Sequence, residues 1–311
     1  MTSTPGTGPV QARVPRRRVD GVLLLDKPGG ISSNAALQRV RRRYRAEKAG
    51  HTGTLDPLAS GLLPLCFGEA TKFAQGLLDA PKAYVATLAF GTATSTGDAE
   101  GEPIAAGPIP ASAAEIEAAL PGFRGRISQV PPRHAALKHE GRSYYEYARA
   151  GVEIPRPARE VVIDALTLLD WLPPRAVLEV RCSKGTYVRT LAEDIAHALG
   201  TEAHLCALRR TASGPFSLAS AVALAEVEMA DDATLGRWLL PIDAPLSGMP
   251  SIVLDETAVS AVTHGRRAAI LANAEGCRAA YDTCGRFVGV VRIEAGSLAA
   301  VRLVRADRGE G

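Results

Sequence analysis

The chain has 311 residues, of which 46% are hydrophobic, and a formal net charge of +3 at pH 7. This length favours two domains, and the chain contains no apolar run of the roughly 18 residues that would predict a membrane span. The N-terminal segment lacks the apolar stretch of a secretory signal, and the five cysteines show neither CxxC pairs nor metal spacing. We therefore expect reduced thiols in the cytoplasm and no metal site.

The first elements are predicted from residues 1–44. Residues 1–19 are rich in Pro, Gly, Thr and Arg and predict a disordered, basic N-terminus. Residues 21–26 (GVLLLD) predict a short buried strand that ends at a Lys-Pro-Gly-Gly turn. Ser32 or Ser33 can then cap a helix over residues 34–44, with its arginines largely on the outer face.

Residues 50–63 (GHTGTLDPLASGLL) place a carboxylate, Asp56, among glycines and small residues. Glycine allows close backbone approach, so a planar group could reach this carboxylate. The same residues also fit a helix that is capped by Asp56 and begins at Pro57. Leu58, Leu62 and Leu63 would then form its buried side. The local pattern leaves both interpretations open.

The rest of the chain predicts a larger α+β domain followed by a smaller β domain. Strands and helices mix without strict βαβ alternation over residues 20–245, which favours a mixed or antiparallel sheet. Strands are predicted at 82–91, 161–169, 176–182 and 203–214, and helices at 111–120, 187–199 and within 221–240. Residues 251–311 show only short strand patterns, which predict a β-barrel-like domain.

Positive charge is concentrated in two segments. Residues 13–48 carry eleven Lys and Arg against three acidic residues, and residues 124–159 carry eight against three. Three of the seven tyrosines, Tyr144, Tyr145 and Tyr147, fall in the second segment. Aromatic residues among cations suit unstacked bases and phosphates, so a nucleic-acid partner is indicated. A solvated charged surface and a packed subdomain are the alternatives.

Four motifs, in order, carry a family resemblance. They are GVLLLDKPGGISSN (21–34), AGHTGTLDPLASGLLPLCFGEATKF (49–73), KAYVATLAFGTATSTGDAEGE (82–102) and CSKGTYVRTLAEDI (182–195). Over about residues 21–245 the chain resembles the bacterial tRNA pseudouridine synthase B family. A weaker similarity extends to that family's C-terminal PUA-like domain. The sequence lacks GxGxxG after a strand and GxxxxGK[ST], so a nucleotide cofactor has no support.

The resemblance implies the pseudouridine synthase α+β core, with a central mixed or antiparallel sheet and a thumb insertion at about residues 124–159. It implies that Asp56 is the catalytic aspartate. It also assigns substrate binding to five further residues: His51, Tyr84, Tyr187, Arg189 and Leu208. Less specific RNA-binding candidates are Lys27, Lys72, Arg133, Lys138 and Arg142. For Lys27 and Lys72, a structural role in ordinary ion pairs is the alternative. Asp98 and Asp194 are expected to be scaffold or ion-pair residues.

The implied function is isomerisation of uridine to pseudouridine at position 55 in the T loop of tRNA. The reaction exchanges one bond for another without redox change or hydrolysis, so no cofactor or metal is expected. The implied enzyme is a cytoplasmic monomer that flips the target base and needs no obligate protein partner. A nucleic-acid glycosidase, a guide-RNA-dependent enzyme and a non-catalytic RNA-binding or RNA-folding module are the alternatives.

Overall fold

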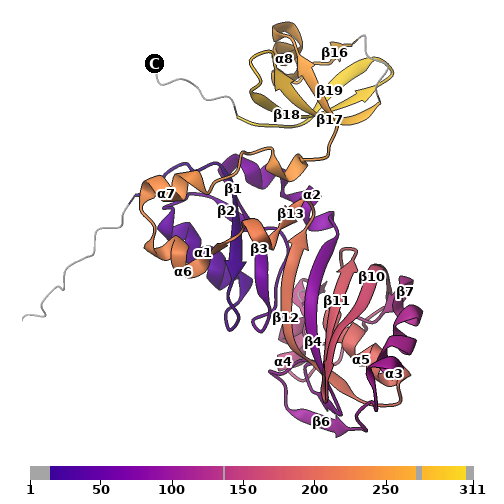
Figure 1. The fold of residues 1–311 in the computed structure, drawn as a ribbon. Helices are drawn as coiled ribbons and strands as arrows, with labels where there is room; N and C mark the ends of the chain where they lie inside the picture. The colour runs from indigo at the N-terminus through magenta and orange to yellow at the C-terminus, as the bar shows by residue number, and fades with distance from the viewer. Residues whose placement is uncertain (1–14, 136, 271–274, 306–311) are drawn as a thin grey trace, which may run out of the picture.

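The computed structural model describes residues 15–135, 137–270 and 275–305 (Figure 1). Residues 1–14 of the predicted disordered segment lie outside this range. Residues 15–19 do not follow that prediction, because Arg17 is held on both sides of its backbone. Its N–H donates to Arg45 O at 2.7 Å, and its carbonyl accepts from Glu47 N at 3.1 Å.

A ten-stranded mixed sheet forms the body of the larger domain, which confirms the predicted α+β class. The strand order is β14-β1-β3-β12-β4-β11-β10-β7, with β13 beside β12 and β2 beside β3. The β1–β14 and β3–β12 pairs are parallel and the other pairs are antiparallel. The strands span Gly21–Lys27 (β1), Ala49–His51 (β2), Ser60–Phe67 (β3), Lys82–Phe90 (β4), Gly125–Gln129 (β7), Arg159–Leu172 (β10), Arg175–Cys182 (β11), Ala203–Ser213 (β12), Phe216–Ser217 (β13) and Val222–Ala223 (β14).

Both faces of the sheet are covered near β1, which explains its continuous apolar run. Leu23 and Leu25 join the main core, whereas Val22 and Leu24 join a second cluster on the opposite face. The main core contains residues of α1 (Ser33–Arg43), α3 (Ala113–Ala119), α5 (Val188–Ala198), α6 (Leu224–Met229) and α7 (Asp232–Arg237). The second cluster lies under η1 (Gly68–Phe73) and α2 (Ala74–Asp79), and short 3-10 turns occur at η2 (Leu120–Phe123), η3 (Leu218–Ser220) and η4 (Ala244–Leu246).

The helix start predicted after Asp56 is wrong, because strand β3 begins at Ser60 instead. Leu62 and Leu63 are buried, but on opposite faces of the sheet rather than along one helical side. Gly61 explains why the segment is extended. Its φ is +97°, and a Cβ there would lie 2.8 Å from Arg210 N on the neighbouring strand β12. Only glycine permits this backbone approach without strain.

An insertion between β7 and β10 corresponds to the basic segment at residues 124–159. It contains β8 (Lys138–His139), β9 (Arg142–Ser143) and α4 (Tyr144–Arg149). Ser143 and Glu146 form a capping box that begins α4. The segment after β4 contains a small hairpin, β5 (Thr92–Thr94) and β6 (Pro103–Ala106).

A separate five-stranded sheet follows the linker near Pro250, in the order β15-β17-β18-β19-β16. Its strands are Ser251–Leu254 (β15), Ala268–Ala269 (β16), Gly276–Asp282 (β17), Phe287–Glu294 (β18) and Ser297–Leu303 (β19). The sequence pattern missed helix α8 (Glu256–Thr263), which Asp255 caps by accepting from Ala258 N at 2.7 Å. No helix in the described part of the chain is long and apolar enough to cross a membrane.

Candidate active site

The Asp56 loop connects β2 to β3 and is fixed from two directions. Ser33, at the start of α1, accepts from Leu55 N at 2.8 Å and donates to Leu55 O at 2.9 Å. Gly30 N donates to Pro57 O at 2.8 Å, so both neighbours of Asp56 are bonded to the β1–α1 segment. A buried hydroxyl that satisfies both backbone groups of Leu55 leaves this loop little freedom.

Asp56 forms an ion pair with Arg189, and Arg189 also contacts a second carboxylate. Arg189 Nη2 lies 3.0 Å from Asp56 Oδ2, and Arg189 Nη1 lies 3.7 Å from Asp98 Oδ2. The guanidinium also donates to Thr96 O at 3.1 Å and His134 O at 2.7 Å. The Arg189 and Asp98 side chains are each 5% exposed, whereas that of Asp56 is 39% exposed. Asp56 is therefore the carboxylate that a substrate can reach.

Burial raises the pKa of Asp56, and this effect exceeds the opposing effect of Arg189. Asp98 also raises this pKa, and the nearby Lys27 charge lowers it. The surrounding protein removes water from the carboxylate on most sides, even though one side faces the pocket. An ionised but poorly hydrated carboxylate is a reactive group, because hydration does not have to be removed before it attacks or accepts a proton.

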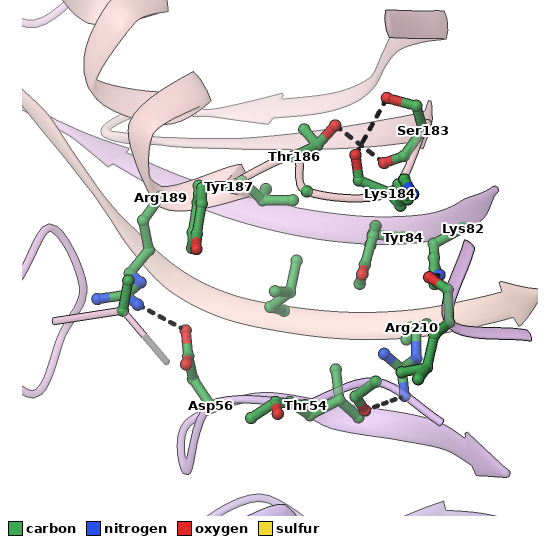
Figure 2. A pocket seen from close by; sticks show the side chains of 17 residues that line it. Thr54, Asp56, Lys82, Tyr84, Ser183, Lys184, Thr186, Tyr187, Arg189 and Arg210 are labelled. Carbon is green, nitrogen blue, oxygen red and sulfur yellow. Dashed lines mark hydrogen bonds and ion pairs between the residues drawn. The ribbon is translucent and has the colours of Figure 1, made fainter. Parts of the chain in front are cut away.

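Asp56 faces a pocket of about 250 Å³ between its loop, strands β4 and β12, and the turn before α5 (Figure 2). The walls include five of the six residues predicted for catalysis and substrate binding: Asp56, Tyr84, Tyr187, Arg189 and Leu208. Burial raises the pKa of both tyrosines, so both phenols stay neutral near pH 7. Two aromatic rings, a leucine and one carboxylate suit a planar, polar group such as a nucleobase.

Two domains of one protein family match consecutive segments of this chain. Residues 41–188 match the TruB family pseudouridylate synthase N-terminal domain, and residues 189–247 match the tRNA pseudouridylate synthase B C-terminal domain. The tRNA pseudouridine synthase B of Thiobacillus denitrificans is 56% identical over 93% of this chain and 97% of that protein. The chain belongs to the TruB family of pseudouridylate synthases.

Further relatives agree with the TruB assignment. The tRNA pseudouridine synthase B of Burkholderia lata is 55% identical over 94% of this chain and 92% of that protein. Among solved structures, a chain of a Cbf5-Nop10-Gar1 complex is 27% identical with a TM-score of 0.69, covering 92% of this chain and 84% of that chain. A chain from an H/ACA RNP bound to a substrate RNA containing 2′-deoxyuridine is 24% identical with the same TM-score of 0.69, over 92% and 85%, and supports the fold alone.

His51, the sixth predicted residue, is not among the residues that line the pocket in front of Asp56, which we call the TruB pocket. It ends β2, just before the Asp56 loop, and is half-buried. Its Nδ1 is buried without a hydrogen-bond partner in the described part of the chain. Burial, with a smaller contribution from Arg210, lowers the pKa of the imidazole and keeps it neutral at pH 7. Its proposed contact with the nucleotide stays a prediction.

Sequence reasoning missed two cations that line the end of the TruB pocket opposite Asp56, as Figure 2 shows. Arg210 is 1% exposed and donates to Leu62 O at 2.6 Å and Gly53 O at 3.3 Å. Lys82 Nζ donates to three backbone carbonyls, and burial lowers its pKa to about 8. Strand periodicity could have identified both cations, because residues two apart on a strand face the same side of the sheet. Arg210 is two residues from Leu208, and Lys82 is two residues from Tyr84.

Of the two roles left open for Lys27, its burial favours the structural one over RNA binding. Lys27 is 0% exposed, and its Nζ donates to Pro28 O at 2.8 Å and Ile31 O at 2.7 Å. Burial lowers its pKa to about 8, while the Asp56 charge opposes that change. Because no RNA phosphate can reach it, Lys27 instead stabilises the turn beside the Asp56 loop. A sequence shows the charge of such a lysine but not its burial.

Lys72 forms an ion pair, the alternative to RNA binding that its sequence position left open. Its Nζ lies 2.6 Å from Glu69 Oε2 and donates to Leu303 O at 3.0 Å, which joins the larger domain to the C-terminal sheet. Phe73 and Phe287 reinforce this contact with ring centroids 5.2 Å apart. The charge of Lys72 is thus already compensated, and its side chain is only 22% exposed.

The other three predicted RNA-binding residues, Arg133, Lys138 and Arg142, lie in the insertion. Arg133 pairs with Glu153 at 2.6 Å, and both side chains are well exposed. Arg142 lies 5.7 Å from the centroid of the Tyr147 ring, and Lys138 is exposed on β8. These side chains remain accessible to RNA, unlike Lys27.

The insertion is bonded to the TruB pocket through its first residues. Gln129, only 2% exposed, accepts from Tyr187 N at 3.0 Å and donates to Tyr187 O at 3.3 Å. His134 O then accepts from Arg189, five residues further along. The stem of the insertion therefore holds both Tyr187 and Arg189, which the sequence pattern did not indicate.

Replacing Ser33 with alanine is expected to lower the free energy of unfolding by about 1–3 kcal/mol, because both backbone groups of Leu55 lose their buried partner. Turnover should fall more than RNA affinity, since the Asp56 loop loosens. Urea unfolding and single-turnover rates measure the two effects. Ser32→Ala is the matched control, because Ser32 caps α1 through Ala35 N without touching the loop. Equal losses of turnover in both variants contradict this role of Ser33.

Proposed function

We propose that this chain isomerises uridine 55 in the T loop of tRNA to pseudouridine, with Asp56 as its catalytic group. Conversion of uridine to pseudouridine in tRNA is the activity of the TruB relatives that match nearly the whole chain. The observation that carries the catalytic assignment is the Asp56–Arg189 pair, 3.0 Å apart, in the wall of a pocket built for one planar group.

The reaction breaks the N1–C1′ bond of uridine and forms a C5–C1′ bond. The proton on C5 is lost to water, and N1 gains a proton, so neither an oxidant nor a hydrolytic water is consumed. Asp56 serves as the nucleophile at C1′ or at the ring, or as the base that removes a ribose proton; each route requires an ionised carboxylate. Arg189 favours that ionised form and fixes its direction.

The detached uracil must turn before C5 can bond to C1′. The pocket suits this step because it is small, at about 250 Å³, and because Tyr84, Tyr187 and Leu208 give part of its wall an apolar surface. Stacking against an aromatic ring offsets part of the few kcal/mol needed to unstack the base from the RNA. We assign these three side chains to holding the base, and His51 to contact with the flipped nucleotide.

A glycosidase would need a second carboxylate to activate water. Asp98 is the other carboxylate that contacts Arg189, but its surroundings do not suit that role. It is 4% exposed and accepts from Thr96 Oγ1 at 2.6 Å and Glu100 N at 3.1 Å, so water has little access to it. Asp98 therefore orients Arg189 rather than activating water, and the TruB relatives favour isomerisation over hydrolysis.

We assign RNA binding to the thumb insertion and to the C-terminal sheet. In the thumb, Arg149 lies 4.4 Å from the centroid of the Tyr145 ring, and Tyr145 is 43% exposed. Such cation–aromatic pairs suit single-stranded nucleotides next to a phosphate backbone. The chain then acts as a monomer in the cytoplasm, where its tRNA substrate is found, without an obligate protein partner.

To test which uridine is modified, we use T-arm stem-loops in which every uridine carries tritium at C5. Wild-type protein is expected to release one tritium per stem-loop and none when uridine 55 is replaced with cytidine. An anticodon stem-loop of the same length is the control RNA. Release from the cytidine variant would place the reaction at another uridine, and no release from either T arm would contradict the proposal.

A further inference from the structure

A groove lined by arginines lies at the C-terminal end of helix α1, separate from the candidate active site. Its walls include Arg16, Gln38, Arg41, Arg42 and Arg45, which we call the arginine groove. Its volume is about 680 Å³, against about 250 Å³ for the active-site pocket. Among the described residues that line it, none is acidic. A hollow with this composition favours an anionic ligand.

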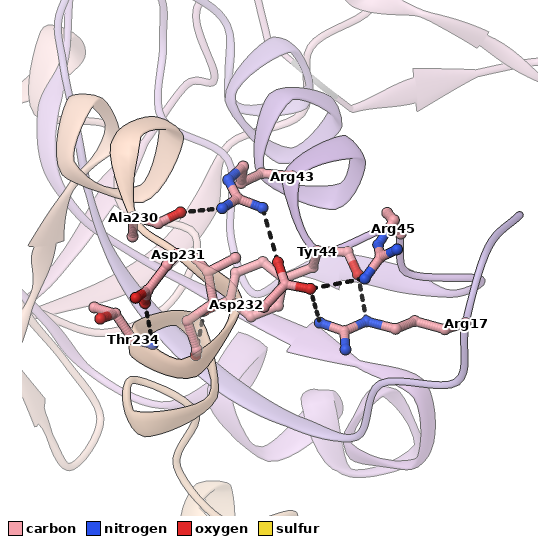
Figure 3. A network of polar contacts seen from close by, with 9 residues as sticks. Arg17, Arg43, Tyr44, Arg45, Ala230, Asp231, Asp232 and Thr234 are labelled. Carbon is pink, nitrogen blue, oxygen red and sulfur yellow. Dashed lines mark hydrogen bonds and ion pairs between the residues drawn. The ribbon is translucent and has the colours of Figure 1, made fainter. Parts of the chain in front are cut away.

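Several neighbouring arginines are already neutralised within the fold. Figure 3 shows Arg43 and Arg45 converging on Asp232, at 3.2 Å and 2.7 Å, with Arg17 at 4.0 Å. Arg39 pairs with Glu228 at 2.6 Å. These contacts join α1 to α6 and α7, so this part of the basic segment has a structural role.

The remaining arginines of the groove have no such partner. Arg16 and Arg42 are exposed, and within the described ranges neither forms an ion pair with a carboxylate. Arg41 donates to Ala46 O at 3.1 Å and to Glu47 O, which orients its guanidinium without neutralising it. An oriented guanidinium matches the geometry of a phosphate group better than a lysine does.

The position of the groove distinguishes it from the thumb. Helix α1 packs on β2 and α6, at one end of the large sheet, whereas the thumb joins the sheet at β7 and β10, at the other end. Five strand spacings separate β1 from β10, or roughly 24 Å at about 4.8 Å per strand. An RNA that contacts both the thumb and the arginine groove must therefore cross most of the width of the sheet.

We propose that the arginine groove binds phosphates of the substrate tRNA outside its T stem-loop. This inference rests on the proposed function only in taking tRNA as the substrate. The groove would add affinity for the folded tRNA without taking part in the chemistry. Each phosphate contact should contribute to the salt dependence of binding, because bound cations are released from the RNA.

The test compares wild-type protein with the Arg16→Gln/Arg42→Gln variant. Affinities for whole tRNA and for the isolated T stem-loop are measured between about 50 and 200 mM salt, with the target uridine replaced with cytidine in both RNAs. For tRNA we expect a roughly tenfold weaker affinity at low salt and a logarithmic salt slope smaller by about 2. For the stem-loop we expect no change.

The single variants Arg42→Gln and Arg39→Gln provide a matched control. Each removes one positive charge from α1, but Arg39 is already paired with Glu228. Equal loss of tRNA affinity in these two variants would indicate a general charge effect and overturn the proposal. Unchanged tRNA affinity in the double variant, or an equal loss for the stem-loop, would overturn it as well. Turnover of the uridine stem-loop by wild-type protein is measured in parallel, so a failure of the proposed function is recognised separately.

Discussion

Replacing Asp56 with asparagine is expected to abolish pseudouridine formation, with a loss of roughly 10⁴-fold or more, as for removal of a group that reacts directly with the substrate. Asparagine has the shape of the aspartate but is neither a nucleophile of comparable strength nor a base. RNA affinity should persist, because the thumb, the basic surfaces and the pocket tyrosines are unchanged. Tritium release from a T-arm stem-loop measures the first effect, and filter binding measures the second.

Asp98→Asn is the matched control, since it makes the same chemical change on the other carboxylate beside Arg189. Asp98 is 4% exposed and is expected to act only by positioning Arg189, so its loss should reduce turnover far less than the loss of Asp56. If Asp56→Asn retains a substantial part of the wild-type rate, or if Asp98→Asn is the more severe change, the assignment of Asp56 is wrong.

Replacing Arg189 with methionine should damage both stability and turnover. Asp98 would lose its ion pair in the interior, and breaking a buried pair on one side costs about 3–5 kcal/mol of unfolding free energy. Thr96 O and His134 O would lose a donor as well. Turnover should fall by roughly 10²- to 10³-fold, as when a preorganised charged or polar donor is removed from an active site. Urea unfolding and single-turnover kinetics measure these losses.

The double variant Arg189→Met/Asp98→Asn separates the two effects. Removing both buried charges should restore much of the stability but none of the turnover, because Asp56 still lacks its cation. Recovery of turnover together with stability would mean that Arg189 acts only on folding.

The pH dependence of turnover should report the environment of Asp56. Burial raises the pKa of this carboxyl, and Arg189 opposes the change. Because the reaction needs the ionised form, the rate should decline as pH falls through this raised pKa, at a higher pH than an ordinary aspartate would produce. Without Arg189 the pKa rises further, so the decline should begin at still higher pH. A profile that Arg189→Met leaves unshifted would contradict the electrostatic role of Arg189.

Most strands could be predicted because their apolar runs are bounded by clear turns. Strand β4 extends from Lys82 to Phe90 against a predicted 82–91, and β12 from Ala203 to Ser213 against 203–214. The segment after Asp56 was mistaken because Pro57 and the following leucines fit a helix start as well as a buried strand. What decides between them is the close approach of Gly61 to Arg210, a contact between residues 149 positions apart that no local pattern contains.

The candidate site was only partly accessible to local reasoning. The residues around Asp56 left both a helix cap and a catalytic carboxylate open, and the family motifs supplied the partners that the structure brings to one pocket. Buried cations were the main failure. Lys27 was left between RNA binding and a structural role, and Arg210 was not singled out, because burial depends on which strands pair across the sheet. Gln129 escaped notice because its partner is the backbone of Tyr187, which carries no sequence signal.

The buried cations give the site a consistent electrostatic character. Arg189 is 5% exposed, Arg210 1% and Lys27 0%, and they surround a loop whose reachable acid is Asp56. Each is held by backbone carbonyls, so the positive charges are fixed before substrate arrives. Fixed charges stabilise a developing anion at little reorganisation cost, which suits a reaction that detaches uracil from its ribose.

The most direct test of uridine isomerisation is the product formed in a single turnover of the 5-tritiated T-arm stem-loop. Nucleoside analysis of the RNA is compared with tritium released to water over the same time course. We expect one pseudouridine for each tritium released, and no free uracil in solution. Free uracil with an abasic position in the RNA would show cleavage rather than isomerisation and would contradict the account.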